Sequence, residues 1–217
     1  MKIEQYVMAY GVEQDRLRAV IPDGFTSIRP VLRINAEIID ENRSYIEFNT
    51  PIGRDGKKGW LNIACWNDIP FEKKGREVIF RADFLEISFT YTGIEGACPA
   101  EKDNDGCYFI GGKMLLRSPE TITACKEFCD CRFKWKFTEE DAEGVSIGKT
   151  LPAHHEEIKK IYAREAFTAE NAAKIPCRQV LGAYAVKFDR WLDKWMYNER
   201  PDSAIRQNAL PGLFTCN

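Results

Sequence analysis

Apolar and polar residues alternate along much of the chain, and this pattern predicts a protein built mainly from β-strands. The clearest case covers residues 131–138, where Phe133, Trp135 and Phe137 alternate with Arg132 and two lysines. Such a strand has one buried face and one face in water. Strands are predicted at 1–11, 31–39, 44–50, 59–66, 76–80, 84–93, 111–117, 131–138 and 177–188, the pair 76–80 and 84–93 forming either one bent strand or two.

Helical spacing is confined to a few segments. Residues 12–21 place apolar side chains on one helical face, and Pro22–Asp23–Gly24 ends that helix. Residues 154–167 carry the best helical pattern, and 168–175 follow with Thr168 as the N-cap. A short helix is expected within 118–129 and a short helix or bent edge strand at 189–199, while 97–109 are expected to form a polar loop.

Eight or so strands joined by hairpins, with helices inserted late, indicate an α+β fold with a mainly antiparallel sheet. Asp55–Gly56 supplies the positive backbone torsions of a tight hairpin. A barrel or cone closed on itself removes exposed strand edges and leaves an interior for a small ligand. We expect residues 1–217 to form one such β-barrel domain with a few peripheral helices.

Charge and hydropathy narrow the function classes. The chain has 31 basic and 33 acidic residues, a net charge of −2 and a pI near 5.9, with basic residues dispersed among acids. We therefore expect no nucleic-acid partner. No apolar run approaches the roughly 20 residues that span a bilayer, and the first residues lack a signal-peptide pattern. The expected location is cytoplasmic, without a membrane partner.

Eight cysteines are many for a cytosolic chain, but most are expected to be reduced. Cys65 and Cys177 stand in apolar stretches typical of small buried side chains. Cys125, Cys129 and Cys131 form a C-x3-C-x-C cluster, which permits a zinc or thiol function if a fourth ligand comes from elsewhere. The candidates for that ligand are Cys98, Cys107, His154 and His155; packing is the simpler interpretation, and no metal is assigned.

Two adjacent lysines, Lys73 and Lys74, raise the question of an amine nucleophile. A neighbouring ammonium depresses the pKa of a lysine, and only the neutral amine attacks a carbonyl. Glu72 before the pair and Gly75 after it favour a solvated turn instead. Lys113, within a predicted strand, is the alternative amine, because a strand side chain can point inward.

Alternation also places polar residues together on two predicted strands. Arg33, Asn35 and Glu37 share one face of the first, and Glu47 and Asn49 share one face of the second. This face is either the solvent side of the sheet or a polar lining of the barrel interior. In the second case Arg33, with Arg29 nearby across Pro30, would hold a carboxylate through its bidentate guanidinium.

Several stretches resemble acetoacetate decarboxylase-like proteins: DRLRAVIPDGF, RPVLRINAEI, YIEFNTPI and GKKGWLNIACWNDIPFEKKGREVIF, within residues 12–80. The resemblance implies a cone-shaped β-barrel with a central cavity and, in true decarboxylases, a Schiff-base lysine facing an arginine and glutamates. In those proteins a lysine pair follows the G-R-E-[IV] step. Here Lys73–Lys74 precede it, and the next lysine is Lys102, so the nucleophile is missing from its expected place.

These observations together predict a small-molecule-binding protein for a carboxylate or keto acid. Lys113, Lys73, Lys74 and Glu47 are the candidate catalytic residues of a decarboxylase-type lyase, and Arg29, Arg33, Glu37 and Asn49 are the candidate ligand-binding residues. A non-enzymatic ligand-binding or regulatory module is the alternative. None of the common nucleotide-binding or hydrolase motifs occurs, and no cofactor is expected. A homo-oligomer remains open.

Overall fold

A computed structural model describes residues 1–97, 107–110, 113–117, 124–137, 168–189 and 195–197. The strands are β1 (Lys2–Gly11), β2 (Thr26–Ser27), β3 (Val31–Ile39), β4 (Arg43–Arg54), β5 (Lys57–Asn67), β6 (Phe71–Lys74), β7 (Glu77–Arg81), β8 (Leu85–Gly96), β9 (Cys107–Ile110), β10 (Lys113–Arg117), β11 (Lys126–Trp135), β12 (Gln179–Asp189) and β13 (Trp195–Tyr197). Two helices are described, α1 (Gln14–Val20) and α3 (Ala169–Ala173).

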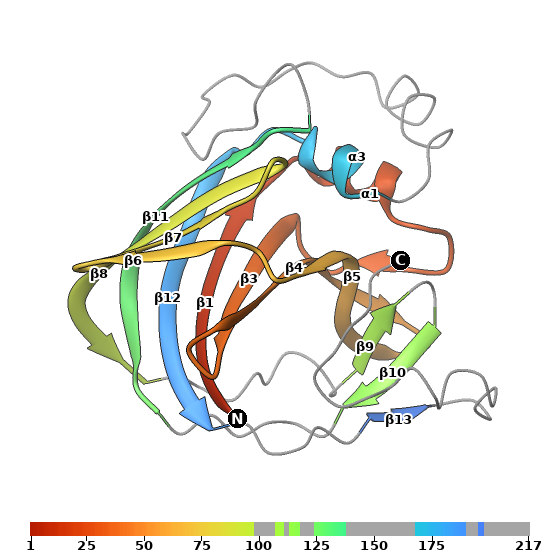
Figure 1. Ribbon diagram of the computed structural model, residues 1–217. Helices are drawn as coiled ribbons and strands as arrows, with labels where there is room; N and C mark the ends of the chain where they lie inside the picture. Colours follow the sequence, from red (N-terminus) through yellow and green to blue (C-terminus); the bar gives the residue numbers. More distant parts are fainter. Residues whose placement is uncertain (98–106, 111–112, 118–123, 138–167, 190–194, 198–217) are drawn as a thin grey trace.

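The strands form one strongly curved sheet in the order β13-β10-β9-β5-β4-β3-β1-β12-β11-β8-β7-β6, with β2 beside β4 (Figure 1). All pairings are antiparallel except that of β5 with β9. The predicted α+β class with a mainly antiparallel sheet is confirmed. Full closure is not, because β6 and β13 are edges of the sheet within the described residues. The barrel is therefore open.

Hairpin connections follow the turn residues of the sequence. Asp55 and Gly56, both with positive φ, join β4 to β5, as Asp-Gly predicts. Asp40 and Glu41 also have positive φ between β3 and β4. The segment 76–93 forms two strands, β7 and β8, which pair with each other.

Aromatic side chains fill the space enclosed by the curved sheet. Tyr6 on β1 contacts Phe80 on β7 and Phe89 on β8, with ring centroids 5.8 and 5.4 Å apart, although β1 is not their neighbour in the sheet. Phe48 contacts Trp135 at 4.6 Å, and the Trp135 indole donates a hydrogen bond to the Tyr10 hydroxyl. The interior expected to hold a ligand is thus occupied by side chains on this face.

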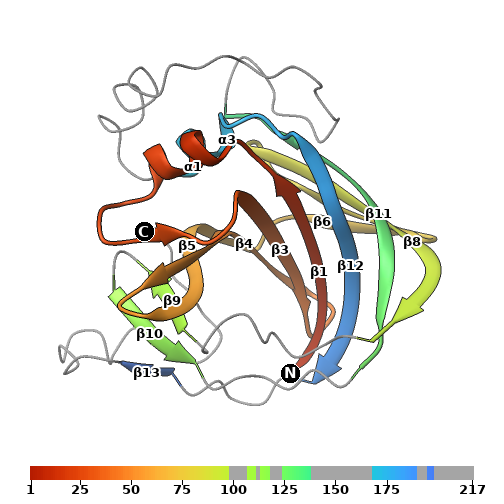
Figure 2. The same ribbon diagram turned by 180° about the vertical axis from the view of Figure 1, so that it is seen from behind.

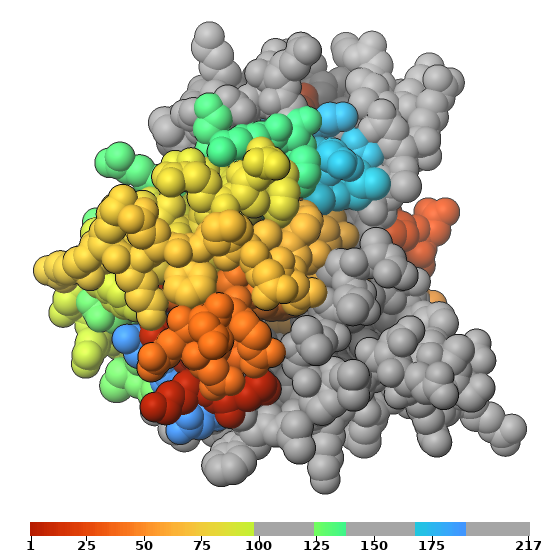
Figure 3. Space-filling view, in the orientation of Figure 1, coloured from red at the N-terminus to blue at the C-terminus, as the bar shows by residue number. Residues whose placement is uncertain are grey.

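The space-filling view shows the same region from outside. Side chains of β5 to β8 cover the left part of the front, and β1, which lies behind them in the ribbon, is visible only at its lower end (Figure 3). The expectation of a hollow barrel lined by polar residues is wrong for the side of the sheet that carries these aromatic rings. The apolar residues of β3, which alternate with its polar residues, lie on this side: Leu32, Ile34, Ala36 and Ile38.

Both helices lie at one end of the curved sheet (Figures 1 and 2). Helix α1 buries Leu17 and Val20 in the core and ends before Pro22, as the sequence predicts. Helix α3 buries Ala172 and Ala173, and the Thr168 hydroxyl accepts a hydrogen bond from the Asn171 amide. The predicted cap is confirmed.

Two segments differ from their predicted secondary structure. Strand β9 begins inside the predicted polar loop 97–109, and β11 begins at Lys126, inside the predicted helix 118–129. In both places pairing with a neighbouring strand overrides weak local preference, β9 with β5 and β11 with β8 and β12. Residues 195–197 form edge strand β13, one of the two alternatives. The predicted helix 154–167 lies outside the described residues.

None of the helices in the described parts of the chain is both long and apolar enough to cross a membrane.

Candidate functional site

Lys73 and Lys74 lie in strand β6 rather than in a turn. The turn that joins β6 to β7 is made by Gly75, whose φ is +58°, and Arg76. Because successive strand residues point to opposite faces, the two ammonium groups lie on opposite sides of the sheet. Lys73 binds Glu4, and Lys74 binds Glu72, at 2.8 Å each. The prediction of a turn is wrong, and the two amines are not placed to act as a pair.

Lys73 belongs to a small polar network at one end of the aromatic interior. Its ammonium donates to the Glu4 carboxylate, which also accepts from the Tyr6 hydroxyl at 2.8 Å. The Tyr6 and Tyr91 hydroxyls share a hydrogen bond of 2.9 Å. Burial acts to raise the pKa of Glu4, but the bonds from Lys73 and Tyr6 and the charge of Lys187 outweigh it and hold that pKa below its ordinary value. The network joins β1 to β6 and β8, which are not its neighbours.

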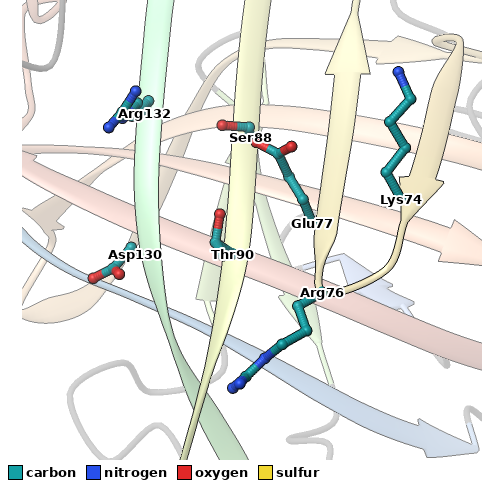
Figure 4. A pocket seen from close by; sticks show the side chains of 7 residues that line it. All are labelled: Lys74, Arg76, Glu77, Ser88, Thr90, Asp130 and Arg132. Carbon is teal, nitrogen blue, oxygen red and sulfur yellow. The ribbon is translucent and has the colours of Figure 1, made fainter.

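Lys74 lines a groove on the outer surface of β6, β7, β8 and β11, with a cavity volume of about 510 Å³ (Figure 4). The Ser88 and Thr90 hydroxyls lie in its middle, and Glu77 extends toward Ser88. Its lining residues are Lys74, Arg76, Glu77, Ser88, Thr90, Asp130 and Arg132. None is buried, so this groove has the character of a solvated sheet face rather than of a desolvated site.

An unusual group of buried polar side chains lies on β3, β4 and β5, on the sheet face opposite the aromatic core. Strand β3 is buried at all nine positions, so both faces of the sheet are covered there. The face opposite the aromatic core carries six buried polar side chains: Arg33, Asn35, Glu37, Glu47, Asn49 and Asn62. We call these six residues the polar cluster. The interpretation as a solvent-facing side is therefore wrong.

The cluster holds its charges through specific contacts. The Arg33 Nε donates to Asn49 Oδ1 at 2.9 Å, and its guanidinium carbon lies 3.5 Å from the centre of the Trp60 ring. Gln5 donates to Glu37 at 2.9 Å, and Asn35 makes a longer bond of 3.5 Å to Glu47. Burying one guanidinium and two carboxylates is costly unless they are paired or bind something.

Strand pairing explains how these residues meet. Arg33 lies opposite Asn49, Asn35 opposite Glu47, and Glu37 opposite Tyr45. A register shift between Phe48 and Asn49 sets Asn49 against Asn62 and Glu47 against Cys65. The extra residue in β5 lets positions three apart share one face, which is characteristic of a β-bulge.

Four cluster residues are among the candidates predicted from the sequence, Arg33, Glu37, Glu47 and Asn49, and Asn35 was predicted on the same face. Asn62 and the supporting Gln5 and Trp60 were not predicted. Asn62 and Trp60 alternate in the segment GWLNIACW, so period two would have grouped them. The bulge would still have hidden their relation to β4.

Two other candidates lie elsewhere. Arg29 precedes β3 and is exposed, so the structure does not bring it into the cluster. Lys113 begins β10, whose partner β9 lies beside β5. Its side chain lies outside the described residues.

Four described cysteines are free: Cys125, Cys129, Cys131 and Cys177. Burial raises the pKa of Cys129 and of Cys177 to about 11, and it also raises the pKa of Cys131. Cys65, expected as a buried thiol, is disulfide-bonded. Within the described residues, no group of three or more His, Cys, Asp and Glu side chains is placed to hold a metal. His154, His155 and Cys98 lie outside that part.

Comparison with known proteins gives a likeness in structure alone. No family model and no curated protein matches the chain. Acetoacetate decarboxylase from Legionella pneumophila superimposes with a TM-score of 0.50 at 12% identity, over 91% of this chain and 83% of that one. A second acetoacetate decarboxylase structure gives 0.51 at 12% identity, over 90% and 87%. The acetoacetate decarboxylase-like fold is therefore confirmed, although the sheet is open rather than a closed barrel.

Proposed function

We propose that the protein binds a small organic acid, such as a keto acid, at the polar cluster. The observation that carries this proposal is the burial of six polar side chains, three of them charged, on β3, β4 and β5. A sheet that needed only stability would have apolar residues at these positions, because buried ion pairs are often no more stabilising than hydrophobic replacements.

Arg33 is the group that would hold the acid. Trp60 stacks on its guanidinium and Asn49 fixes its Nε, so the side chain is oriented before a ligand arrives. A guanidinium presents donors in a rigid fork that matches a carboxylate. Glu47, two strand positions from Asn49, would then be the acid–base group nearest to the bound molecule.

A decarboxylase-type lyase is the more specific version of this function. It is favoured by the fold and requires an amine that forms an imine with a keto acid. Lys73 is bound to Glu4, and Lys74 lies on the outer surface, so neither is positioned at the cluster. Lys113, which begins β10, is the remaining candidate of the three. A ligand-binding protein without catalysis is the alternative, and it needs no lysine.

Binding is tested by titrating acetoacetate and pyruvate into the protein while following its thermal unfolding. Arg33→Lys keeps the charge but loses the fork, and we expect it to weaken binding about 10-fold or more. Arg29→Gln is the matched control, an exposed arginine outside the cluster, and should leave binding unchanged. If neither acid stabilises the wild-type protein, or both variants behave alike, the proposal is wrong.

Catalysis is tested separately by borohydride trapping. The protein is incubated with acetoacetate, reduced, digested and analysed by mass spectrometry. An adduct on Lys113 that disappears in Lys113→Gln would support a lyase. Binding without any adduct would support a non-enzymatic ligand-binding protein.

A further inference from the structure

Two buried oxygen atoms of the polar cluster lack a hydrogen-bond donor. They are Oδ1 of Asn35 and Oδ1 of Asn62, in residues that are 6% and 7% exposed. Most buried polar atoms in proteins find a partner, so each such exception needs an explanation. Both exceptions lie on the same sheet face, on either side of β4.

One orientation of the Asn35 amide is favoured by its contact with Glu47. Its Nδ2 donates to the Glu47 carboxylate. Rotating the amide by 180° would replace that donor with an oxygen and set it against a carboxylate. The oxygen is therefore the atom left over, and it can be satisfied only by a donor from outside the cluster.

The Asn62 amide oxygen also has no donor. Asn62 lies opposite Asn49 across the bulge, and its side chain makes no hydrogen bond within the described residues. Replacing Asn62 by an apolar residue of similar size would remove an unsatisfied acceptor and lose no bond. A residue kept for stability alone would not be an asparagine here.

We propose that the ligand of the polar cluster carries N–H or O–H donors that meet these two oxygens. Resting on the proposed function, this predicts that organic acids which also carry a hydroxyl or amino group bind more tightly than simple keto acids. Asn35 and Asn62 are two strands apart and offset by two residues along the strands, so their strand positions are about 12 Å apart at the usual strand spacing and rise. A compact acid held by Arg33 meets one of them, and a longer ligand with two donors meets both.

The difference in affinity between ligands with and without such a donor can be large. A site built to bond a hydroxyl or amine strongly rejects an analogue without it, because the buried acceptor is then left unpaired. We expect 3-hydroxybutyrate and 3-aminobutyrate to bind at least about 10-fold more tightly than butyrate or acetoacetate, which differ from them only at the third carbon.

The experiment measures these four acids by calorimetric titration against the wild-type protein and three variants. In Asn35→Leu/Asn62→Leu the preference for the hydroxy and amino acids should fall to less than about 2-fold. Asn62→Leu alone should unfold at a temperature equal to or above that of the wild type. Thr50→Val is the control: its hydroxyl donates to the Val31 carbonyl, so it should lose stability but keep the preference.

The outcomes separate the two proposals. If none of the four acids binds, the proposed function fails. If all four bind equally, or the preference survives in the double variant, small-acid binding stands and the donor requirement is overturned. Lower stability of Asn62→Leu without ligand would also contradict it, because the asparagine would then be structural.

Discussion

At the scale of single residues, the ion pair with Glu4 gives Lys73 a structural role. The folded protein lowers the pKa of Glu4 from its ordinary value, so its ionised form stabilises the fold at neutral pH, and this contribution is lost as the pH falls through the lowered pKa. We expect Glu4→Gln to lower the free energy of unfolding by about 0.5–1 kcal/mol at pH 7, with a smaller difference at pH 3.

Urea unfolding at the two pH values checks this. Glu72→Gln is the matched control, since Glu72 and Lys74 form an ion pair in which both side chains are exposed to solvent. It should change stability by only a few tenths of a kcal/mol. An equal loss for Glu4→Gln at pH 7 and pH 3 would show that the ionised carboxylate is not what stabilises the fold.

The free thiols give a second prediction at this scale. The thiolate is the reactive form, and burial raises the pKa of Cys129 and Cys177 to about 11. At pH 8 we expect iodoacetamide to label exposed Cys125 first, with Cys129, Cys131 and Cys177 labelled only in denaturant. Peptide mass spectrometry gives the order. Rapid labelling of Cys129 in the folded protein would contradict this prediction and would support a thiol function for the C-x3-C-x-C cluster.

At the scale of elements, β6 illustrates both the reach and the limits of the sequence. A turn ending at Gly75 and the strand after it, in which Val78 and Phe80 alternate, were predicted from the sequence. The placement of Lys73 in a strand was not, since a charged four-residue segment has weak β-preference and becomes a strand only by pairing with β7. The same applies to β9, which depends on its parallel pairing with β5.

Strand β6 is also an edge of the sheet within the described residues, and its lysines have a second consequence. Charged residues on an edge discourage pairing with another copy of the chain. We expect Lys74→Val to raise concentration-dependent self-association, measured by light scattering during size-exclusion chromatography. Arg132→Val is the control, because β11 has neighbours on both sides. Equal behaviour of both variants would make lost surface charge, rather than the edge, responsible.

The polar cluster was predictable in part for a physical reason. Alternation alone places Arg33, Asn35 and Glu37 on one face, and Glu47 and Asn49 on another strand's face. Alternation cannot decide whether a polar face meets solvent or is covered, because covering comes from segments distant in sequence. It also fails across the bulge in β5, so Asn62 and its relation to Asn49 emerge only from the structure.

At the scale of the whole molecule, the sheet depends on one late strand. Strand β12 lies between β1 and β11 and so joins the N-terminal strands to β8, β7 and β6. Tyr6 and Phe80 meet across the aromatic interior only because this join lets the sheet curve back on itself. A local pattern in residues 177–188 predicts a strand but not this central position, which is set by pairing with residues at the start of the chain.

This position gives a sharp test of the fold. Ala185 pairs with Tyr6 on one side and Glu127 on the other, so Ala185→Pro removes a ladder hydrogen bond from a central strand. We expect it to lower the free energy of unfolding by about 3 kcal/mol or more. Leu181→Pro is the control, because Leu181 is exposed and lies where the register between β1 and β12 shifts. It should cost clearly less, since bulges tolerate proline. Urea unfolding followed by circular dichroism measures both, and equal losses would mean that β12 does not hold the two parts of the sheet together.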